Sequence, residues 1–381
     1  MATPASTRLT RLRTRRSGAD RIDQVAMDSK TFILNKSMAQ ESWEKRTTGK
    51  PFTSYAIGAM QEVDADYTRI SLETAERVSN QLQNRLAAVN IQAEYRLQGS
   101  VPLNVHIRGV SDVDLLILAT GFYTYDRTGL MSTQGGHYLY PSTRTSIDVL
   151  HELRRESETA LKNAFPAATV NTSGAKAIKI HGGSLPRPVD VVPAHWHDSV
   201  SYQQSRAEHD RVVTILDKDR SLTIDNWPFL HIKLITDMCN NTRGSLRKAI
   251  RLCKNIKADK EEDGRKIALS SFDIASIMYH ANTHNLMMAS FFELGVLAET
   301  QRHLDHLALN KAHAMTLRTP DSSRVILDSE DKHASLMTLS VELDELIRLV
   351  AKEHSPAFNL IEKPGLVDCR NTLSSISVPT A

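Results

Sequence analysis

The most informative part of the sequence is Leu97-Gln98-Gly99-Ser100, followed after eleven residues by Asp112-Val113-Asp114 and the apolar run Leu115-Leu116-Ile117-Leu118. The apolar run predicts a buried strand, on which residues i and i+2 share a face, about 6.6 Å apart. Two carboxylates at this spacing can bind one or two divalent cations, as metal-assisted phosphoryl transfer requires. The glycine lets backbone approach a phosphate, whose oxygens the serine hydroxyl can bind. Taken alone, the acid pair is more typical of two solvated residues at a strand start.

A third acid changes this interpretation. Asp190 stands inside the apolar segment Val189-Asp190-Val191-Val192-Pro193, which predicts another buried strand. A carboxylate is costly to bury in such a strand unless it is paired or bound to a metal. The Gly-Ser turn and the three acids therefore fit one site.

Hydrophobic periodicity divides the chain into helical and strand-rich parts. Apolar residues at steps of three to five predict a long helix over about 62–90, and a second helix is expected over 145–163. Beyond residue 225 the pattern is helical again. Short apolar segments predict strands at 93–98, 112–119, 168–171, 177–181, 189–193 and 212–216. The expected fold class is α+β, with a mixed sheet facing a helical domain across a cleft.

Four segments are expected along the chain. Residues 1–21 are interpreted as a disordered basic leader, 22–225 as a core with N-terminal helices, 226–370 as a helical domain, and 371–381 as a mobile tail. The leader holds six arginines and one acid, whereas the rest of the chain has a net charge of −2. A body without excess positive charge argues against stable nucleic-acid binding.

Composition excludes several classes of protein. No run of about 18 apolar residues is present, so no transmembrane helix and no membrane partner are expected. The three cysteines are widely spaced and form no Cys-x-x-Cys motif, which disfavours a disulfide framework and a zinc ribbon. The sequence is therefore typical of a protein of a reducing, cytoplasmic compartment.

The Gly-Ser turn, the Asp-x-Asp pair and the later Asp190 resemble the nucleotidyltransferase superfamily of the polymerase beta kind. The flanking residues, including Val110-Ser111 and Pro193-Ala194, resemble the bacterial CD-NTases. These enzymes make cyclic oligonucleotide second messengers in anti-phage (CBASS) defence. The resemblance covers roughly residues 60–350 and implies a polymerase-beta-like core with a C-terminal helical domain.

The resemblance also implies roles for individual residues. The three acids would hold two Mg²⁺ ions, with Mn²⁺ as a substitute. Lys254 matches a triphosphate-binding lysine, Ser271 a phosphate contact and Phe272 a base-stacking platform. The expected site residues are Asp112, Asp114 and Asp190 for catalysis and metal binding, and Gln98, Gly99, Ser100, Lys254, Ser271 and Phe272 for nucleotide binding.

The function implied is synthesis of a cyclic di- or trinucleotide from nucleoside triphosphates in the bacterial cytoplasm. The product would act through a downstream effector, and regulatory partner proteins are compatible with the family. Three alternatives stay open: a template-independent transferase acting on tRNA or poly(A) tails, a synthase of linear oligoadenylate, and an inactive binding module. The first needs a basic track for RNA, and the third is disfavoured by three intact acids.

Overall fold

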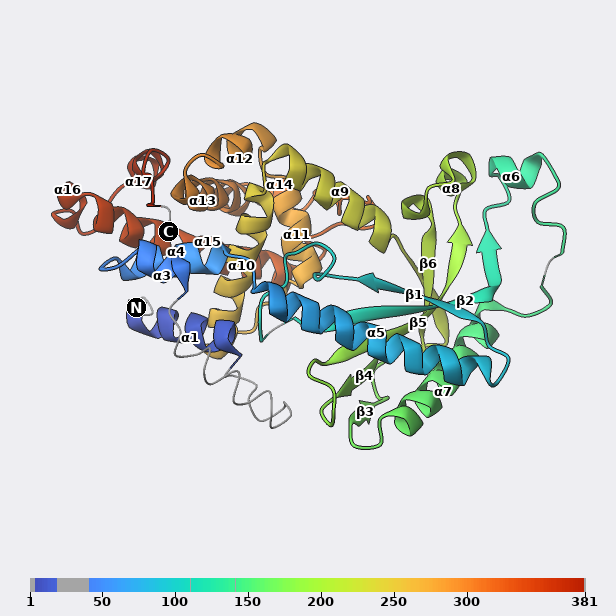
Figure 1. Ribbon diagram of the computed structural model, residues 1–381. Coiled ribbons are helices and arrows are strands. Elements are labelled where there is room, and N and C mark those ends of the chain that lie inside the picture. The colour runs from blue at the N-terminus through green and yellow to red at the C-terminus, as the bar shows by residue number, and fades with distance from the viewer. Residues whose placement is uncertain (1–3, 19–40, 110, 141, 380–381) are drawn as a thin grey trace.

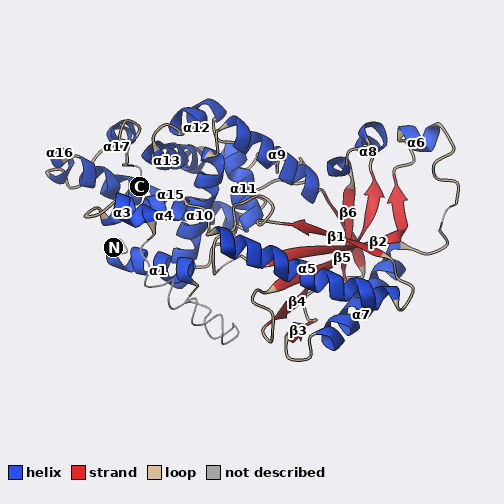
Figure 2. Ribbon diagram, viewed as in Figure 1, coloured by secondary structure: helices blue, strands red, loops and turns tan. Residues whose placement is uncertain are grey.

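A computed structural model describes residues 4–18, 41–109, 111–140 and 142–379. A mixed sheet with flanking helices lies beside a larger helical part, and the two chain ends lie on the far side of the helical part (Figure 1). Figure 2 shows that all strands belong to the sheet region. The α+β expectation is therefore confirmed. The sequence from residue 22 to 46 has a helix-compatible pattern, but most of this segment lies outside the described residues.

The sheet is organised around two long parallel strands, β2 and β5. Strand β1 pairs with the free side of β2, and the other side of β5 is shared by β4 near its start and β6 near its end, all antiparallel. The seven strands are β1 (Ala93–Gln98), β2 (Val113–Tyr125), β3 (Thr169–Asn171), β4 (Ile178–His181), β5 (Val189–Asp198), β6 (Val212–Asp217) and β7 (Leu222–Asn226).

The two faces of the sheet bury different side chains because successive strand residues point in opposite directions. Odd-numbered residues of β2 and β5, such as Val113 and Val191, pack under helices α5 (Ala65–Ala87) and α7 (Ser146–Ala164). Even-numbered residues such as Leu116 and Ala194 form a smaller cluster on the opposite face. The aspartates of both strands have even numbers, so they belong to this second face.

The helical part has one large core that also takes in the N-terminal helices. Its central helix is α10 (Ser245–Glu262), which contacts α4, α11 and α13. The other helices of this part are α1 (Ala5–Ser17), α3 (Ser42–Arg46), α4 (Pro51–Met60), α9 (Pro228–Asn241), α11 (Ser271–Tyr279), α12 (Thr283–Ala289), α13 (Glu293–Leu309), α14 (Lys311–Ala314), α15 (Glu330–His354), α16 (Pro356–Asn359) and α17 (Leu366–Leu373). Two short helices, α6 (Leu130–Thr133) and α8 (Val200–Ser205), lie near the outer end of β2 (Figure 1).

The expectation of a disordered leader over 1–21 is wrong for its described part. Residues 5–17 form α1, in which Leu9 and Leu12 are buried in the helical core. Arg8 is buried against Glu342 of α15, with 2.6 Å between Nη2 and Oε2. The segment was interpreted as disordered because it is basic and polar, but its arginines find carboxylate partners far along the chain. The N-terminal helices therefore pack with the helical part rather than with the sheet.

The expectation of a mobile tail over 371–381 is also wrong for the residues that the structure describes. Residues up to Leu373 complete α17, and Leu373 itself is fully buried. Val378 packs into the helical core, and Arg46 donates a hydrogen bond to the carbonyl of Pro379. The described residues up to 379 are thus anchored.

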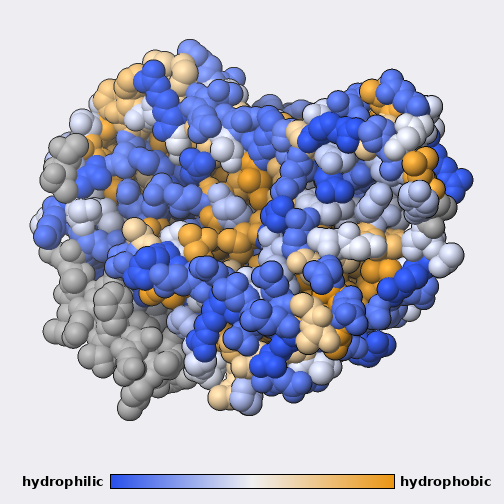
Figure 3. Space-filling view, turned by 45° about the vertical axis from the view of Figure 1, so that its right-hand side comes forward, coloured by the Kyte–Doolittle hydropathy of each residue, from blue (hydrophilic) through white to orange (hydrophobic). Residues whose placement is uncertain are grey.

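Among the described helices, none is both long and apolar enough to cross a membrane. On the face shown in Figure 3, hydrophilic residues predominate and apolar ones gather toward its centre.

Candidate active site

A row of polar side chains crosses four strands of the sheet at one level. Gln98 of β1 is paired with Asp114 of β2, Asp114 with Asp190 of β5, and Asp190 with Lys179 of β4. Directly paired residues point to the same side of a sheet, about 4.5–5.5 Å apart. The register therefore brings two of the three predicted acids together on the face away from α5 and α7.

The third acid, Asp112, lies one residue before β2 begins and is joined to this row through Lys179. The ammonium of Lys179 is 2.7 Å from Asp112 Oδ2 and 3.6 Å from Asp190 Oδ1. Asp190 Oδ1 is buried and makes no hydrogen bond. The acids thus face a shared positive charge supplied by the protein itself.

Burial makes two of these carboxyl groups, those of Asp114 and Asp190, weaker acids. Burial, followed by the nearby charges of Asp190 and Asp112, raises the pKa of Asp114 to about 7. Burial also raises the pKa of Asp190, against the opposing effect of Lys179. The hydrogen bond to Asp112 is the main reason that the pKa of Lys179 is raised. The site therefore favours a positive group between the acids.

The Gly-Ser turn fits tightly over the acids. Gly99 has φ +75°, a conformation that residues with a Cβ rarely adopt, and a Cβ at this position would collide with Asp114 Oδ2. The following loop closes on itself because the Ser100 carbonyl accepts a hydrogen bond from the Val105 amide, 3.1 Å away. The glycine thus lets the backbone lie directly against Asp114.

A cavity of about 700 Å³ separates the acids from the helical part. On the sheet side it is lined by the Gly-Ser turn and the three acids, and on the helical side by the start of α11. The predicted site residues that line it are Gln98, Gly99, Ser100, Asp112, Asp114, Asp190, Ser271 and Phe272. Its volume lies within the range of ~300–1,000 Å³ that is usual for small-molecule sites.

The helical wall offers a hydroxyl and an aromatic ring to this cavity. Ser270 caps α11 by accepting from the Asp273 amide, so the next hydroxyl, on the exposed Ser271, is not needed as the cap. Phe272 stacks on His231 with ring centroids 4.2 Å apart, and the Arg324 guanidinium lies 5.2 Å from its ring centre. An aromatic face beside a cation suits a nucleobase with its phosphates.

Lys254 is the one predicted site residue that does not line the cavity. Its side chain is buried, and its ammonium donates to the Val105 carbonyl at 2.8 Å and to Ser111 Oγ at 3.3 Å. Burial lowers its pKa to about 7, although Asp114 acts in the opposite direction. In this arrangement Lys254 braces the loop between the Gly-Ser turn and the Asp-x-Asp pair.

The donor set suits a hard divalent cation, since it consists of carboxylate oxygens and includes the unbonded Asp190 Oδ1. Among the described residues, no three Asp, Glu, His or Cys side chains converge as a ready-made metal cluster. The ammonium of Lys179 instead contacts both Asp112 and Asp190.

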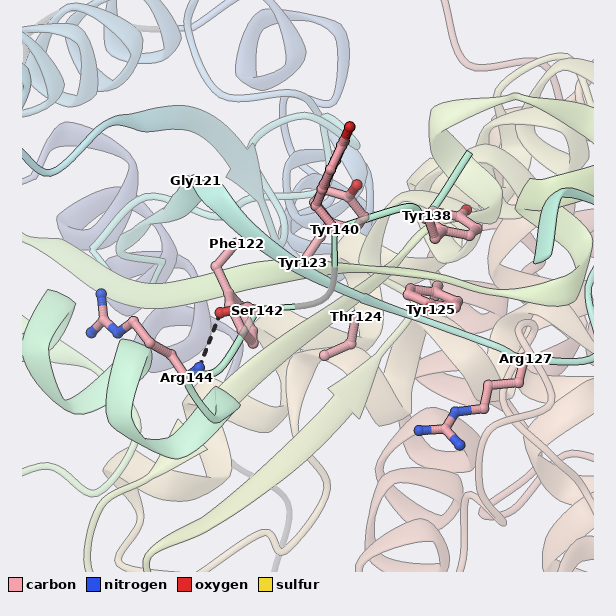
Figure 4. Close-up of a pocket in the computed structure, with 10 residues that line it drawn as sticks. All are labelled: Gly121, Phe122, Tyr123, Thr124, Tyr125, Arg127, Tyr138, Tyr140, Ser142 and Arg144. Atoms are coloured by element: carbon pink, nitrogen blue, oxygen red, sulfur yellow. Dashed lines mark hydrogen bonds between the residues drawn. The ribbon is translucent and has the colours of Figure 1, made fainter. Parts of the chain in front are cut away.

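A second, smaller cavity of about 310 Å³ lies at the opposite end of β2. The Gly-, Tyr- and Thr-rich stretch from residue 121 to 141 is typical of a loop, but its first residues, up to Tyr125, continue strand β2. Tyr125 and Tyr138 stack there with ring centroids 3.9 Å apart, as Figure 4 shows. None of the predicted site residues lines this cavity.

Sequence reasoning missed Lys179, His231 and Arg324 as site residues. Lys179 had a usable signal, because a lone charge between Ile178 and Ile180 is as unusual as Asp190 between valines. His231 lies in a helix and Arg324 in a loop, and their proximity to Phe272 is a product of tertiary packing.

Comparison with known proteins agrees with this geometry. No protein-family model matches the chain. A cyclic dinucleotide synthase, CdnE, from Yersinia aleksiciae is 44% identical over 365 residues, covering 93% of this chain and 94% of that protein.

Solved structures give the same result. The STING-associated CdnE c-di-GMP synthase from Capnocytophaga granulosa has a TM-score of 0.68 and 26% identity, covering 90% of this chain and 97% of that one. A second STING-associated CdnE c-di-GMP synthase, from Flavobacteriaceae sp., has a TM-score of 0.69, covers 92% and 99%, and shares the fold at 23% identity. The resemblance found in the motifs is confirmed, and the chain belongs to the CdnE cyclic dinucleotide synthases, which are nucleotidyltransferases of the CD-NTase group.

Proposed function

We propose that this chain joins two purine nucleoside triphosphates into a cyclic dinucleotide. The observation that carries this proposal is the cavity itself, in which three acids on the sheet face Ser271 and Phe272 on α11. A dinucleotide rather than a trinucleotide is favoured because the relative from Yersinia aleksiciae is named a cyclic dinucleotide synthase. Purines are favoured because they stack well on an aromatic ring such as Phe272.

Asp112, Asp114 and Asp190 would hold two Mg²⁺ ions, with Mn²⁺ as a substitute. Bound there, the ions would activate a ribose hydroxyl and neutralise charge that develops on the phosphates. Asp190 would accept the proton of the attacking hydroxyl. The oxygen of that ribose hydroxyl forms a bond to the α-phosphorus of the other nucleotide. The bond from this phosphorus to the oxygen that bridges it to the β-phosphate breaks, and pyrophosphate leaves. A second round closes the ring.

The remaining residues would position the nucleotides. Ser100 and Ser271 would donate hydrogen bonds to phosphate oxygens, and Gln98 lies beside Asp114 at the edge of the same row. Phe272 would stack on a base. Lys254 would act through the loop that it braces, with its charge near the acids, rather than by direct contact.

The product would act on a downstream effector in anti-phage defence, as the STING association of related synthases suggests. A cytoplasmic location and control by regulatory partner proteins belong to the same proposal. An RNA-directed transferase is not favoured, since the relatives are cyclic dinucleotide synthases.

The test incubates the purified protein with Mg²⁺ and the four ribonucleoside triphosphates, without RNA, and then adds a phosphatase. We expect a resistant product with one negative charge per nucleotide and no free ends, identified by mass spectrometry. Asp112→Asn and Asp114→Asn should each keep less than a few per cent of turnover, because a lost metal ligand weakens transition-state binding. Asp237→Asn, an exposed change on α9, is the matched control.

Two results would contradict the proposal. A phosphatase-sensitive product would identify a linear oligomer synthase. Extension of a tRNA or poly(A) substrate, while free nucleotides are ignored, would identify an RNA-directed transferase.

A further inference from the structure

The ammonium of Lys179 lies against two of the three carboxylates that would bind the metal ions. Its ammonium lies 2.7 Å from Asp112 Oδ2 and 3.6 Å from Asp190 Oδ1, so it touches the first and third acids at once. A lysine ammonium and a divalent cation repel each other at such distances, so they compete for these oxygens.

The position of Lys179 beside the acids is set by the pairing of strands β4 and β5, and not only by the conformation of its side chain. Lys179 pairs directly with Asp190 across β4 and β5, and its neighbours Ile178 and Ile180 are fully buried on the opposite face. The backbone position is therefore fixed by apolar packing. The side chain, in contrast, is 44% exposed, and its four-carbon stem can swing away without disturbing the core.

We propose that Lys179 is a resident counter-cation that neutralises the acids when no metal is bound and is displaced when metal enters. This inference rests on the proposed metal-dependent function and deepens it. Displacement leaves the ammonium at the cavity edge, where the phosphates of an incoming nucleotide offer it a new partner. Metal binding should therefore be weak in the empty enzyme and strengthened by nucleotide.

The experiment compares Lys179→Met, which keeps the length of the side chain but removes its charge, with Lys179→Arg, which keeps the charge. Lys176→Met, an exposed change three residues earlier, is the matched control. Mn²⁺ binding is measured without nucleotide by electron paramagnetic resonance of the free ion, and thermal unfolding is followed in chelator and in Mn²⁺.

We expect Lys179→Met to bind Mn²⁺ about tenfold more tightly, since a unit positive charge at contact distance is removed from a divalent cation. The same variant should unfold at a lower temperature in chelator, because the acids lose their counter-charge, and should gain more from Mn²⁺ than the wild type. Lys179→Arg and Lys176→Met should bind Mn²⁺ as the wild type does.

Two results would overturn the inference, and they are distinguishable. If Mn²⁺ binding depends on Asp112, as shown by its loss in Asp112→Asn, but is unchanged in Lys179→Met, the lysine is no counter-cation and the metal site stands. If wild-type Mn²⁺ binding survives Asp112→Asn, the metal assignment fails, and the role of Lys179 fails with it.

Discussion

Asp114 carries a cost of burial that depends on pH. Its pKa in the folded chain is about 7, well above the value near 4 that an unfolded aspartate has. Between these values the folded chain holds a proton that the unfolded chain has released. The contribution of Asp114 to stability is therefore complete below about pH 4 and is lost as the pH rises toward 7.

Asp114→Asn removes this dependence, because the amide does not ionise. In chelator, the variant should be more stable than the wild type at pH 8, and the margin should be smaller at pH 5. Urea denaturation at the two pH values measures the free energy of unfolding. Asp237→Asn, at an exposed position, should show no such pH-dependent margin, and an equal margin for Asp114→Asn at both values would contradict the burial argument.

Phe272 has one ring face on His231, and its position at the cavity suits it to stack on a base. Stacking is worth about 1–3 kcal/mol per base, so Phe272→Ala should raise KM for the nucleotide about 5- to 140-fold. Steady-state kinetics measures this effect, and Phe291→Ala, at an exposed position, is the control. A large fall in melting temperature with KM unchanged would show that the ring serves only the core.

Helix α1 contacts both α10 and the loop before the Asp-x-Asp pair. Arg15 is buried beside Asp259 of α10, with 2.6 Å between Nη2 and Oδ1, and Tyr55 bonds the other carboxylate oxygen. Arg108, in the loop before the Asp-x-Asp pair, donates to the Arg16 carbonyl at 2.9 Å. The N-terminal helix therefore supports the loop that precedes the Asp-x-Asp pair.

Arg15→Ala should lower the free energy of unfolding by about 3–5 kcal/mol, because it leaves the Asp259 carboxylate buried without its partner. Chemical denaturation measures the change. Arg69→Ala, which removes an exposed ion-paired arginine from α5, should have little effect. Similar losses for both variants would mean that the buried pair contributes no more than a surface pair.

The sequence predicted those elements that are specified by a pattern of neighbouring residues. Strand β1 was expected at 93–98 and is found there. Asp114 and Asp190 lie on strands as expected, and the register of β2 with β5 brings them to one cavity, whereas Asp112 lies one residue before β2. Helix α1 was missed because its stabilising partners Asp259 and Glu342 lie 244 and 334 residues away. Lys254 was placed in a helix correctly, but helical periodicity alone does not say which loop covers its side chain.

The cavity lies between the sheet and the helical part, so a ligand bound there should raise the free energy of unfolding of the protein. A ligand that contacts both sides adds its binding free energy to folding, about 2.7 kcal/mol at a hundred times its Kd. A non-hydrolysable GTP analogue with Mg²⁺ should therefore raise the melting temperature, and chelator should reverse most of the rise. Asp190→Asn should show a much smaller shift, whereas an equal shift would place the ligand elsewhere.

The burial of Arg8 against Glu342 also bears on how the protein is made. A ribosome releases helix α1 long before its partner Glu342 on α15, which lies 334 residues later in the chain. Contacts of such large sequence separation form late and slow folding. A chain interrupted before α15 would thus lack this buried contact, and helix α1, which supports the loop before the Asp-x-Asp pair, would be held less firmly.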